Sequence, residues 1–246
     1  MRLDQELVNR GYFPSREKAK CAILAGQIRV SGRSICKPGD IVKPTDFIKV
    51  LQKEKYVSRG GYKLEGALKH FQIDVNGMIA IDIGASTGGF TDCLLQHGAS
   101  KVYAVDVGKG LLAFPLRNDP RVVVMEKTNA RYITREHFQN TFQLADIVVI
   151  DCSFISLKLI IPPVLNLIKE NGKIIALVKP QFEAGKKEAD KGKGIIKDPI
   201  VHQRIIADLE NYVKNNLVLT WRGVVESPIE GQSGNKEFLI YLEKNT

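Results

Sequence analysis

Four charged residues stand where a buried sheet is expected to end in small or apolar side chains. Asp151 and Lys179 directly follow two apolar segments, and Glu237 directly precedes a third. Parallel strands finish at one edge of a sheet and an antiparallel strand starts there, so topology alone can bring these three side chains together. Lys63, in the sequence SRGGYKL, can reach the same edge. Lysines set among carboxylates can position a reacting hydroxyl and take up its proton, which is general-base chemistry.

A glycine-rich turn predicts what binds beside these groups. In MIAIDIGASTGGF the apolar run Ile79–Ile83 is followed by the turn Gly84–Gly89, and helical spacing begins beyond Phe90. A strand, a turn and a helix N-terminus place free backbone N–H groups and a helix dipole where they favour an anion. Asp106 lies 22 residues after Gly84. At roughly 20 residues an acid typically contacts a cofactor ribose, so we expect a nucleoside cofactor with a negative group.

The spacing of the glycines separates two cofactor classes. A dinucleotide-binding dehydrogenase uses Gly-x-Gly-x-x-Gly, which lets the backbone approach a pyrophosphate. Here the pattern is Gly-x-x-x-Gly-Gly, and Ser86 occupies the position of the second glycine. S-adenosylmethionine has a carboxylate, an amine and a ribose but no pyrophosphate, so the turn favours a methyltransferase.

Alternating strands and helices predict the scaffold that must position these residues. The alternation runs from residue 78 onward and is typical of a parallel sheet with crossover helices. A helix is expected from Pro199 through Val213, and the short loop 226–236 predicts that the last two strands pair antiparallel. This is an α/β fold with a seven-stranded sheet. After the strand at 79–83, the expected strands are 101–107, 121–126, 145–151, 173–179, 217–225 and 238–242.

The positive charge of the chain is concentrated in its first quarter. Residues 1–60 hold 13 Lys and Arg against 6 Asp and Glu, whereas the other 186 residues hold 23 against 21. A small basic domain joined to a nearly neutral one indicates a module that binds a polyanion. Its pattern predicts two helices, the second capped by Ser15, then short strands at 27–30, 34–35 and 47–51.

This first module resembles the S4 RNA-binding domain, a small α+β fold, over residues 1–51. The sequence MRLDQELVNRGYFPSREKAKCAILAGQIRVSGRSICKPGDIV carries the resemblance. It implies binding to structured RNA through phosphate contacts rather than base edges. Residues 52–57 are expected to be a linker, and residues 58–246 the second domain. The candidate RNA-binding residues are Arg10, Arg16, Lys18, Lys20, Arg29 and Arg33.

The whole chain resembles the TlyA family, also called the haemolysin A family. The motifs SRGGYKL, DIGASTGGFTDCLL, VDVG, IDCSFISL, LVKPQFE and GNKEFLIYL carry this resemblance. It implies a Rossmann-like class I methyltransferase domain similar to FtsJ, which uses S-adenosylmethionine to methylate a ribose 2′-oxygen in ribosomal RNA. It also implies a Lys-Asp-Lys-Glu tetrad at Lys63, Asp151, Lys179 and Glu237.

The resemblance further implies how the cofactor and the acceptor are held. Lys179 is expected to act as the base or to orient the hydroxyl, with Asp151 positioning Lys179 and contacting the cofactor amine. Lys63 and Glu237 would complete the network around the hydroxyl. Relatives use an acid against the adenine where this chain has Asn129. The expected cofactor-binding residues are Gly84, Ala85, Ser86, Gly88, Gly89, Phe90, Asp106, Val107, Asn129 and Asp151.

Other functions remain as alternatives. Cys152 is a candidate nucleophile of a cytosine carbon-five methyltransferase, although Asp151 rather than proline stands beside it and a second suitably placed cysteine is absent. A ribosome-assembly factor without activity and a membrane-lytic protein are the other two. The stretch after Lys179 holds Lys186, Lys187, Lys191 and Lys193, which either clamp RNA or form a solvated loop.

Composition sets the remaining expectations. The four cysteines form no Cys-x-x-Cys pair, so we expect no metal site and a reducing compartment. No run of about 18 apolar residues is present, which predicts a cytoplasmic protein without a membrane span. The partner is ribosomal RNA or a ribosomal subunit, with cytidine and the large subunit favoured and the small subunit also open. The sequence leaves the oligomeric state undetermined.

Overall fold

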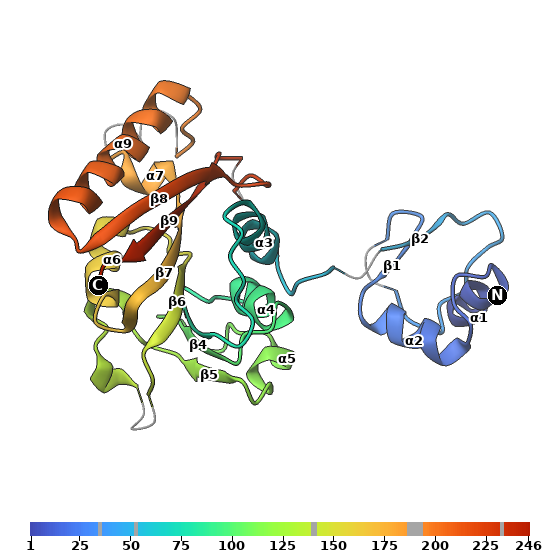
Figure 1. The fold of residues 1–246 in the computed structure, drawn as a ribbon. Coiled ribbons are helices and arrows are strands. Elements are labelled where there is room, and N and C mark those ends of the chain that lie inside the picture. The colour runs from blue at the N-terminus through green and yellow to red at the C-terminus, as the bar shows by residue number, and fades with distance from the viewer. Residues whose placement is uncertain (34–35, 52–53, 139–141, 186–193, 232–233) are drawn as a thin grey trace. The chain divides into compact units, whose positions relative to one another are not determined.

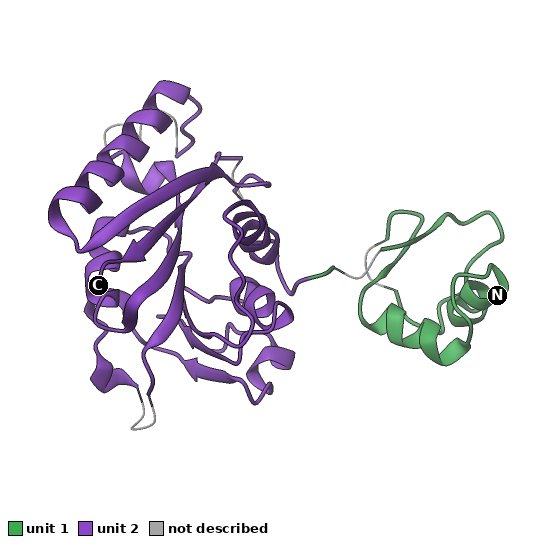
Figure 2. Cartoon of the chain, viewed as in Figure 1, with its two compact units in different colours: residues 1–55 green, residues 56–246 purple. Residues whose placement is uncertain are grey.

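The chain folds into two compact units, each with its own buried core. A computed structural model describes residues 1–33, 36–51, 54–138, 142–185, 194–231 and 234–246. The units comprise Met1–Lys55 and Tyr56–Thr246 (Figure 2). In the described residues no helix is long and apolar enough to cross a bilayer.

The first unit has two helices followed by a two-stranded antiparallel sheet (Figure 1). The Ser15 hydroxyl accepts a hydrogen bond from the Lys18 backbone N–H at the start of the second helix, as expected of a helix cap. The predicted strand at 34–35 falls outside the described residues. The elements are α1 (Leu3–Asn9), α2 (Arg16–Leu24), β1 (Ile28–Val30) and β2 (Ile48–Val50).

The junction between the units differs from the expected linker, residues 52–57, at the C-terminal end of that linker. Tyr56, which was expected to lie in the linker, is 2% exposed and packs in the core of the second unit. Its ring lies edge-on to that of Tyr62 with the centroids 5.2 Å apart. A Cβ added to Gly61 would come within 2.2 Å of the Tyr56 ring, so the glycine makes room for this packing.

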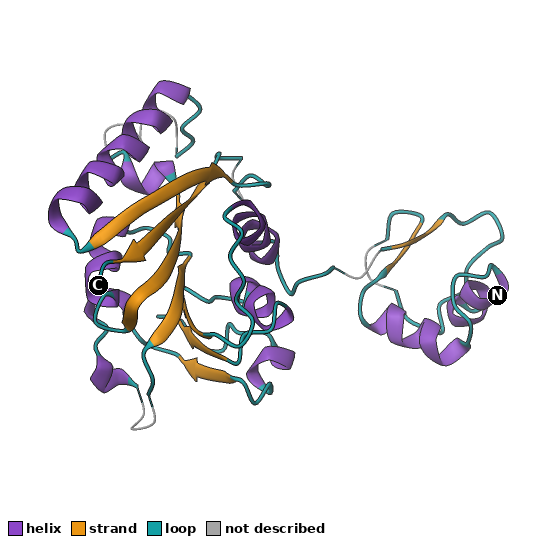
Figure 3. Cartoon of the chain, in the orientation of Figure 1, coloured by secondary structure: helices purple, strands orange, loops and turns teal. Residues whose placement is uncertain are grey.

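The second unit is built on a seven-stranded sheet with the order β5-β4-β3-β6-β7-β9-β8 (Figure 3). The pairs from β5 to β7 are parallel, and β9 runs antiparallel to both β7 and β8. The predicted seven strands and antiparallel last pair are confirmed. The strands are β3 (Ile79–Ile83), β4 (Lys101–Val105), β5 (Val122–Met125), β6 (Ala145–Ile150), β7 (Ile168–Val178), β8 (Leu219–Glu226) and β9 (Phe238–Lys244).

Helices cover both faces of this sheet, because the buried strands carry apolar residues on alternate sides. Ala80, Val102 and Ile147 pack with the helices before and after β3, whereas Ile81 and Val148 pack with the helices that flank β7. The first face is covered by α3 (Gly60–His70), α4 (Gly89–Gln96) and the short α5 (Phe114–Arg117), and the second by α6 (Leu157–Val164) and α9 (Pro199–Asn216). Short pieces are η1 (Ala130–Tyr132), η2 (Arg135–His137) and α7 (Pro180–Glu183).

Candidate active site

The glycine turn joins β3 to α4 through backbone that most residues avoid. Gly84 has φ +83° and Gly88 has φ +97°, both in the left-handed region. A Cβ on Gly84 would lie 2.5 Å from the Asp151 carbonyl oxygen, so the two strand ends approach closely only because this residue is glycine. Ser86, between the glycines, also has a positive φ of 49°. The turn therefore brings α4 and its first N–H groups to the carboxyl end of the sheet.

A pocket of about 400 Å³ opens beside this turn at the carboxyl ends of β3, β4 and β6. It is lined by cofactor candidates from four separate segments and has apolar walls at Leu111, Ile155 and Ile160. A pocket with apolar walls and a few polar groups, among them Asp106 and Asp151, suits a nucleoside. The cofactor candidates in its lining are Gly84, Ser86, Asp106, Val107, Asn129 and Asp151.

Asp106 and Asn129 hold the rim of this pocket through backbone bonds. The Asp106 carboxylate accepts hydrogen bonds from the Ser86 N–H at 2.8 Å and the Gly108 N–H at 2.7 Å. The acid is thereby fixed beside the turn, as its spacing predicts. The Asn129 side-chain oxygen accepts from the Arg131 N–H at 3.0 Å and caps η1.

A smaller pocket of about 180 Å³ links the 400 Å³ pocket, below called the cofactor pocket, to the charged residues. Its walls include Ala85, Gly89 and Phe90 together with Lys63 and Lys179. Gly88 lines none of the described pockets. A Cβ there would approach the Leu116 side chain to 2.3 Å, so this glycine shapes the turn from behind.

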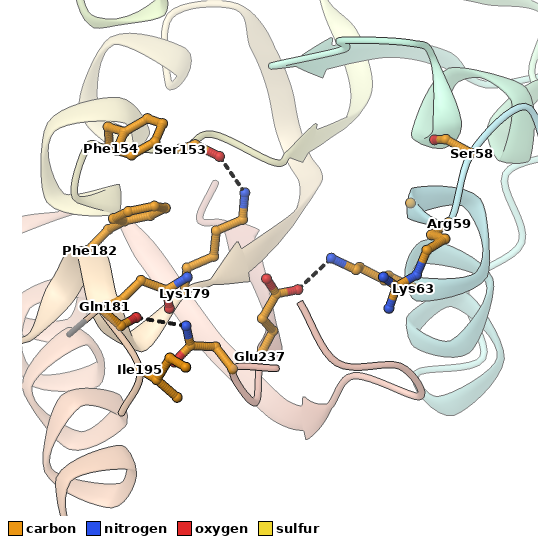
Figure 4. Close-up of a pocket in the computed structure, with 13 residues that line it drawn as sticks. Ser58, Arg59, Lys63, Ser153, Phe154, Lys179, Gln181, Phe182, Ile195 and Glu237 are labelled. Atoms are coloured by element: carbon orange, nitrogen blue, oxygen red, sulfur yellow. Dashed lines mark hydrogen bonds and ion pairs between the residues drawn. The ribbon is translucent and has the colours of Figure 1, made fainter. Parts of the chain in front are cut away.

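The four charged residues converge, as the topology predicts, and form two ion pairs. Lys63 Nζ lies 2.5 Å from Glu237 Oε2 (Figure 4). Lys179 Nζ lies 2.6 Å from Asp151 Oδ1. Lys63 and Glu237 are only 8% and 3% exposed. All four side chains line the small pocket or the larger one of about 750 Å³ beyond it.

Sheet register explains this convergence. Asp151 follows β6 and Lys179 follows β7, and these two strands are parallel neighbours. Glu237 precedes β9, whose first residue, Phe238, pairs with Val178 at the end of β7. Lys63 lies in the first half of α3, which packs against the start of α4 and against β9. The site is thus built from segments that are up to 174 positions apart in the sequence.

The pocket of about 750 Å³ contains residues that the sequence-based assignment missed. Phe154 is 89% exposed, yet its ring lies 4.9 Å from that of Phe182, and both line the pocket (Figure 4). Their motifs, IDCSFISL and LVKPQFE, were the available signal, but an exposed aromatic cannot be told from a core aromatic by its letter. Other newly placed lining residues are Ser58, Arg59, Ser153, Gln181, Ile195 and Asn235.

Asp82 is a further residue that the assignment missed. It is fully buried in β3, where the Thr91 hydroxyl donates a 2.6 Å hydrogen bond to it. Burial raises the pKa of Asp82 to about 7. The signal in the sequence was a single acid inside an otherwise apolar strand.

Cys152 is a poor candidate for a nucleophile. Burial, together with the neighbouring Asp151 charge, raises the pKa of the Cys152 thiol to about 12. The thiolate is the nucleophilic form of cysteine, and it is scarce at neutral pH when the pKa is so high. Among the described residues no three His, Cys, Asp or Glu side chains gather to hold a metal.

In the first unit, the basic candidates differ in how they are held. The Arg10 guanidinium donates to the Glu6 carboxylate at 2.7 Å and to the carbonyl oxygens of Lys43, Pro44 and Asp46. Arg10 therefore binds its own domain and joins α1 to the loop before β2. This structural role was not expected from the sequence, which assigned Arg10 to RNA.

Arg16 is exposed and oriented by a buried acid. Its guanidinium and that of Arg2 both pair with Asp4, which has no exposed surface. The Arg2 hydrogen bond, with help from Arg16, lowers the pKa of Asp4 to about 2. Of the other candidates, Lys18 and Arg33 are exposed, Lys20 pairs with Glu17, and Arg29 donates to the Gly26 carbonyl oxygen.

Known proteins match both units. The FtsJ-like methyltransferase family matches residues 56–244, and the S4 domain matches residues 1–48. The 16S/23S rRNA (cytidine-2'-O)-methyltransferase TlyA of Mycobacterium tuberculosis is 43% identical over 249 residues, which cover 100% of this chain and 90% of that protein. Hemolysin A of Brachyspira hyodysenteriae is 44% identical over 244 residues, or 98% and 99% of the two chains.

A solved structure matches over the same length. The structure of a Streptococcus thermophilus protein named as a hemolysin covers 100% of this chain and 88% of its own, with 42% identity and a TM-score of 0.75. The motif resemblance, the fold and the S4 module are confirmed together. The chain belongs to the TlyA family, in which an S4 domain precedes an FtsJ-like methyltransferase domain.

Proposed function

We propose that this protein transfers a methyl group from S-adenosylmethionine to the 2′-oxygen of a ribose in ribosomal RNA. The observation that carries the proposal is the convergence of Lys63, Asp151, Lys179 and Glu237 beside the glycine-turn pocket. A 2′-hydroxyl is a weak nucleophile, and a group of two lysines and two carboxylates can align it and accept its proton.

The residues around the turn fit S-adenosylmethionine. The cofactor pocket adjoins the small pocket at Gly84, Ser86 and Asp151, which line both. The N–H groups that open α4 favour a carboxylate, and Asp106 is placed for ribose hydroxyls. When bound there, the cofactor supplies a methyl group that its positive sulfur already activates.

The protein's own residues then manage the acceptor hydroxyl. Lys179 orients the hydroxyl and, as the free amine, takes up its proton as the oxygen attacks the methyl group. The ammonium that results pairs with Asp151, as in the 2.6 Å ion pair. Lys63 and Glu237 lie on the other side of the hydroxyl, and the ion pair between them fixes the orientation of both side chains. Phe154 and Phe182 line the wider pocket, which leaves room for a nucleotide.

Relatives support the choice of substrate. The Mycobacterium tuberculosis relative is named as a cytidine-2'-O-methyltransferase of 16S and 23S rRNA, and a Campylobacter jejuni relative as one of 23S rRNA. Cytidine is therefore the proposed acceptor, with large-subunit rRNA first and small-subunit rRNA second. Because such an enzyme works on ribosomes, we infer a cytoplasmic location. The S4 unit would contact folded rRNA through Arg16, Lys18, Lys20, Arg29 and Arg33.

Transfer of a labelled methyl group from S-adenosylmethionine to purified ribosomal subunits tests the proposal. We expect labelling of a cytidine ribose, and a loss of about a hundredfold or more in Lys179→Ala with cofactor affinity retained. Lys169→Ala, at the opposite end of the strand that Lys179 follows, is the control. A wild-type protein that binds RNA but transfers no methyl group would instead favour an assembly factor. Normal turnover in Lys179→Ala would remove Lys179 from the mechanism.

A further inference from the structure

Ser153 occupies the point at which the pockets of the second unit meet. Three pockets meet here: the cofactor pocket, the small linking pocket, and the pocket of about 750 Å³, here called the acceptor pocket. Among the described residues, Ser153 is the one that lines all three. It is exposed rather than packed in the core. It lies outside the tetrad, so its position calls for an explanation of its own.

The Ser153 hydroxyl contacts the lysine assigned to the reaction. Lys179 Nζ donates to Ser153 Oγ at 2.9 Å (Figure 4). It also pairs with Asp151 Oδ1 at 2.6 Å. A lysine nitrogen is tetrahedral and offers three positions beyond its own carbon. The Ser153 oxygen takes one of them, and the Asp151 carboxylate lies within ion-pair distance. The ion pair holds the nitrogen near the carboxylate, and the hydrogen bond to Ser153 adds a direction.

The backbone around Ser153 is held tightly enough to aim its hydroxyl. The next residue, Phe154, has φ +64°, which is strained for a bulky side chain. Such strain persists where the surrounding structure fixes the chain. On one side of the loop, the Asp151 N–H donates to the Ile83 carbonyl oxygen at 2.9 Å.

Glu183 fixes the other side of the same loop. Its carboxylate accepts from the Ser156 hydroxyl at 2.6 Å and from the Leu157 N–H at 2.8 Å, at the start of α6. Glu183 ends α7, which begins directly after Lys179. The loop that carries Ser153 and the segment that carries Lys179 are therefore tied together at two places.

We propose that Ser153 is a positioning residue for methyl transfer: together with the Asp151 ion pair, its hydrogen bond holds the Lys179 nitrogen where it faces the acceptor hydroxyl. This inference rests on the proposed function. Removal of the Ser153 oxygen should lower the rate of the chemical step and leave both substrates binding normally, because the hydroxyl acts through Lys179.

Ser153→Ala and Ser153→Thr in the full chain test this role. Because the variant Ser153→Ala loses a hydrogen bond to a charged group, we expect its kcat to be roughly tenfold to a hundredfold below that of the wild type. The KM values for the cofactor and for the RNA should stay within about twofold of the wild-type values. Ser153→Thr keeps the hydroxyl and should recover most of kcat. Ser100→Ala, at the opposite edge of the sheet, removes a serine that bonds only to the Gly77 and Met78 carbonyl oxygens and should leave activity unchanged.

The outcomes separate this inference from the proposed function. Wild-type kcat in Ser153→Ala, equal losses in the alanine and threonine variants, or a loss confined to KM would each overturn the role of Ser153. If in the same assay Lys179→Ala were inactive, the proposed function would still stand. If the wild-type protein transferred no methyl group, the proposed function itself would fail.

Discussion

The Lys63 ammonium and the Glu237 carboxylate face each other where water hardly reaches them. At 8% and 3% exposure, either charge alone would be costly, because a buried ion without its partner loses its hydration. Each charge thus stabilises the buried charge of the other, and both side chains also line the pocket of about 750 Å³. Loss of activity on changing one of them mixes a direct and a structural effect.

A double-mutant cycle separates these effects. Lys63→Met should destabilise the protein by about 3 kcal/mol, because Glu237 is left buried and unpaired. Lys63→Met combined with Glu237→Gln should recover much of that stability but none of the methyl transfer. Urea unfolding measures the first quantity and labelled-methyl transfer the second. Additive losses of stability would show that the two side chains do not depend on each other.

Asp82 should give the protein a pH-dependent stability of unusual sign. Burial raises the pKa of Asp82 to about 7, so between about pH 4 and pH 7 the folded protein keeps a proton that the unfolded chain releases. Stability from this group is present at low pH and falls as pH rises through that window, by up to ~1.4 kcal/mol per unit.

Asp82→Asn isolates this contribution, since the amide keeps an oxygen for the Thr91 hydroxyl but cannot ionise. The variant should gain stability over the wild type at pH 8 and gain little at pH 4.5, as measured by urea unfolding at both values. An equal difference at the two pH values would mean that Asp82 does not titrate in this range.

At the scale of elements, hydrophobic patterning predicted the sheet but not every boundary. β7 begins at Ile168, five residues before the predicted start at Lys173. The added residues include exposed Lys169, Glu170 and Asn171, and pairing with β6 shifts register there, so no apolar alternation reveals them. The convergence of the charged residues at the strand ends was predictable, because the strand topology alone fixes which ends lie at the same edge of the sheet.

What the sequence could not supply is the choice of partners. Arg10 and Arg16 look alike as letters, but one binds carbonyl oxygens of its own domain and the other extends from a buried acid. Likewise Ser153 is one serine among several until the structure places its oxygen beside Lys179. Such pairings depend on side-chain directions that neither periodicity nor spacing encodes.

Two glycines test the turn that holds the cofactor pocket. Gly84→Ala adds a Cβ 2.5 Å from the Asp151 carbonyl oxygen at φ +83°. Gly110→Ala meets nothing within 4 Å at φ +71°. The control should lose about 1–2 kcal/mol from its backbone conformation alone, and Gly84→Ala should lose more and also bind S-adenosylmethionine weakly. Calorimetric titration and urea unfolding measure both effects; equal losses would mean that the close approach is unimportant.

At the scale of the whole molecule, the proposed function assigns RNA binding to the first unit and cofactor binding to the second. The three pockets are lined entirely by residues of the second unit, and the buried cores of the two units share no residue. Changes in the first unit should therefore alter RNA binding without altering cofactor binding.

Removing positive charge from the first unit tests this division. Arg16→Gln with Lys18→Gln should weaken rRNA binding and lower the slope of log K against log salt by about 0.7–0.9 for each phosphate that is no longer neutralised. Affinity for S-adenosylmethionine should stay the same. Lys169→Gln with Lys214→Gln removes equal charge from the second unit and is the control. An unchanged salt dependence in the first variant would mean that RNA binds elsewhere.

The position of β9 within the sheet also governs when the enzyme can begin to work. β9 lies between β7 and β8, although it follows both in the sequence. During synthesis β8 has no partner strand until residues 238–244 have left the ribosome, and Glu237 cannot meet Lys63 before then. A nascent chain whose β9 has not yet emerged thus lacks the complete charged site.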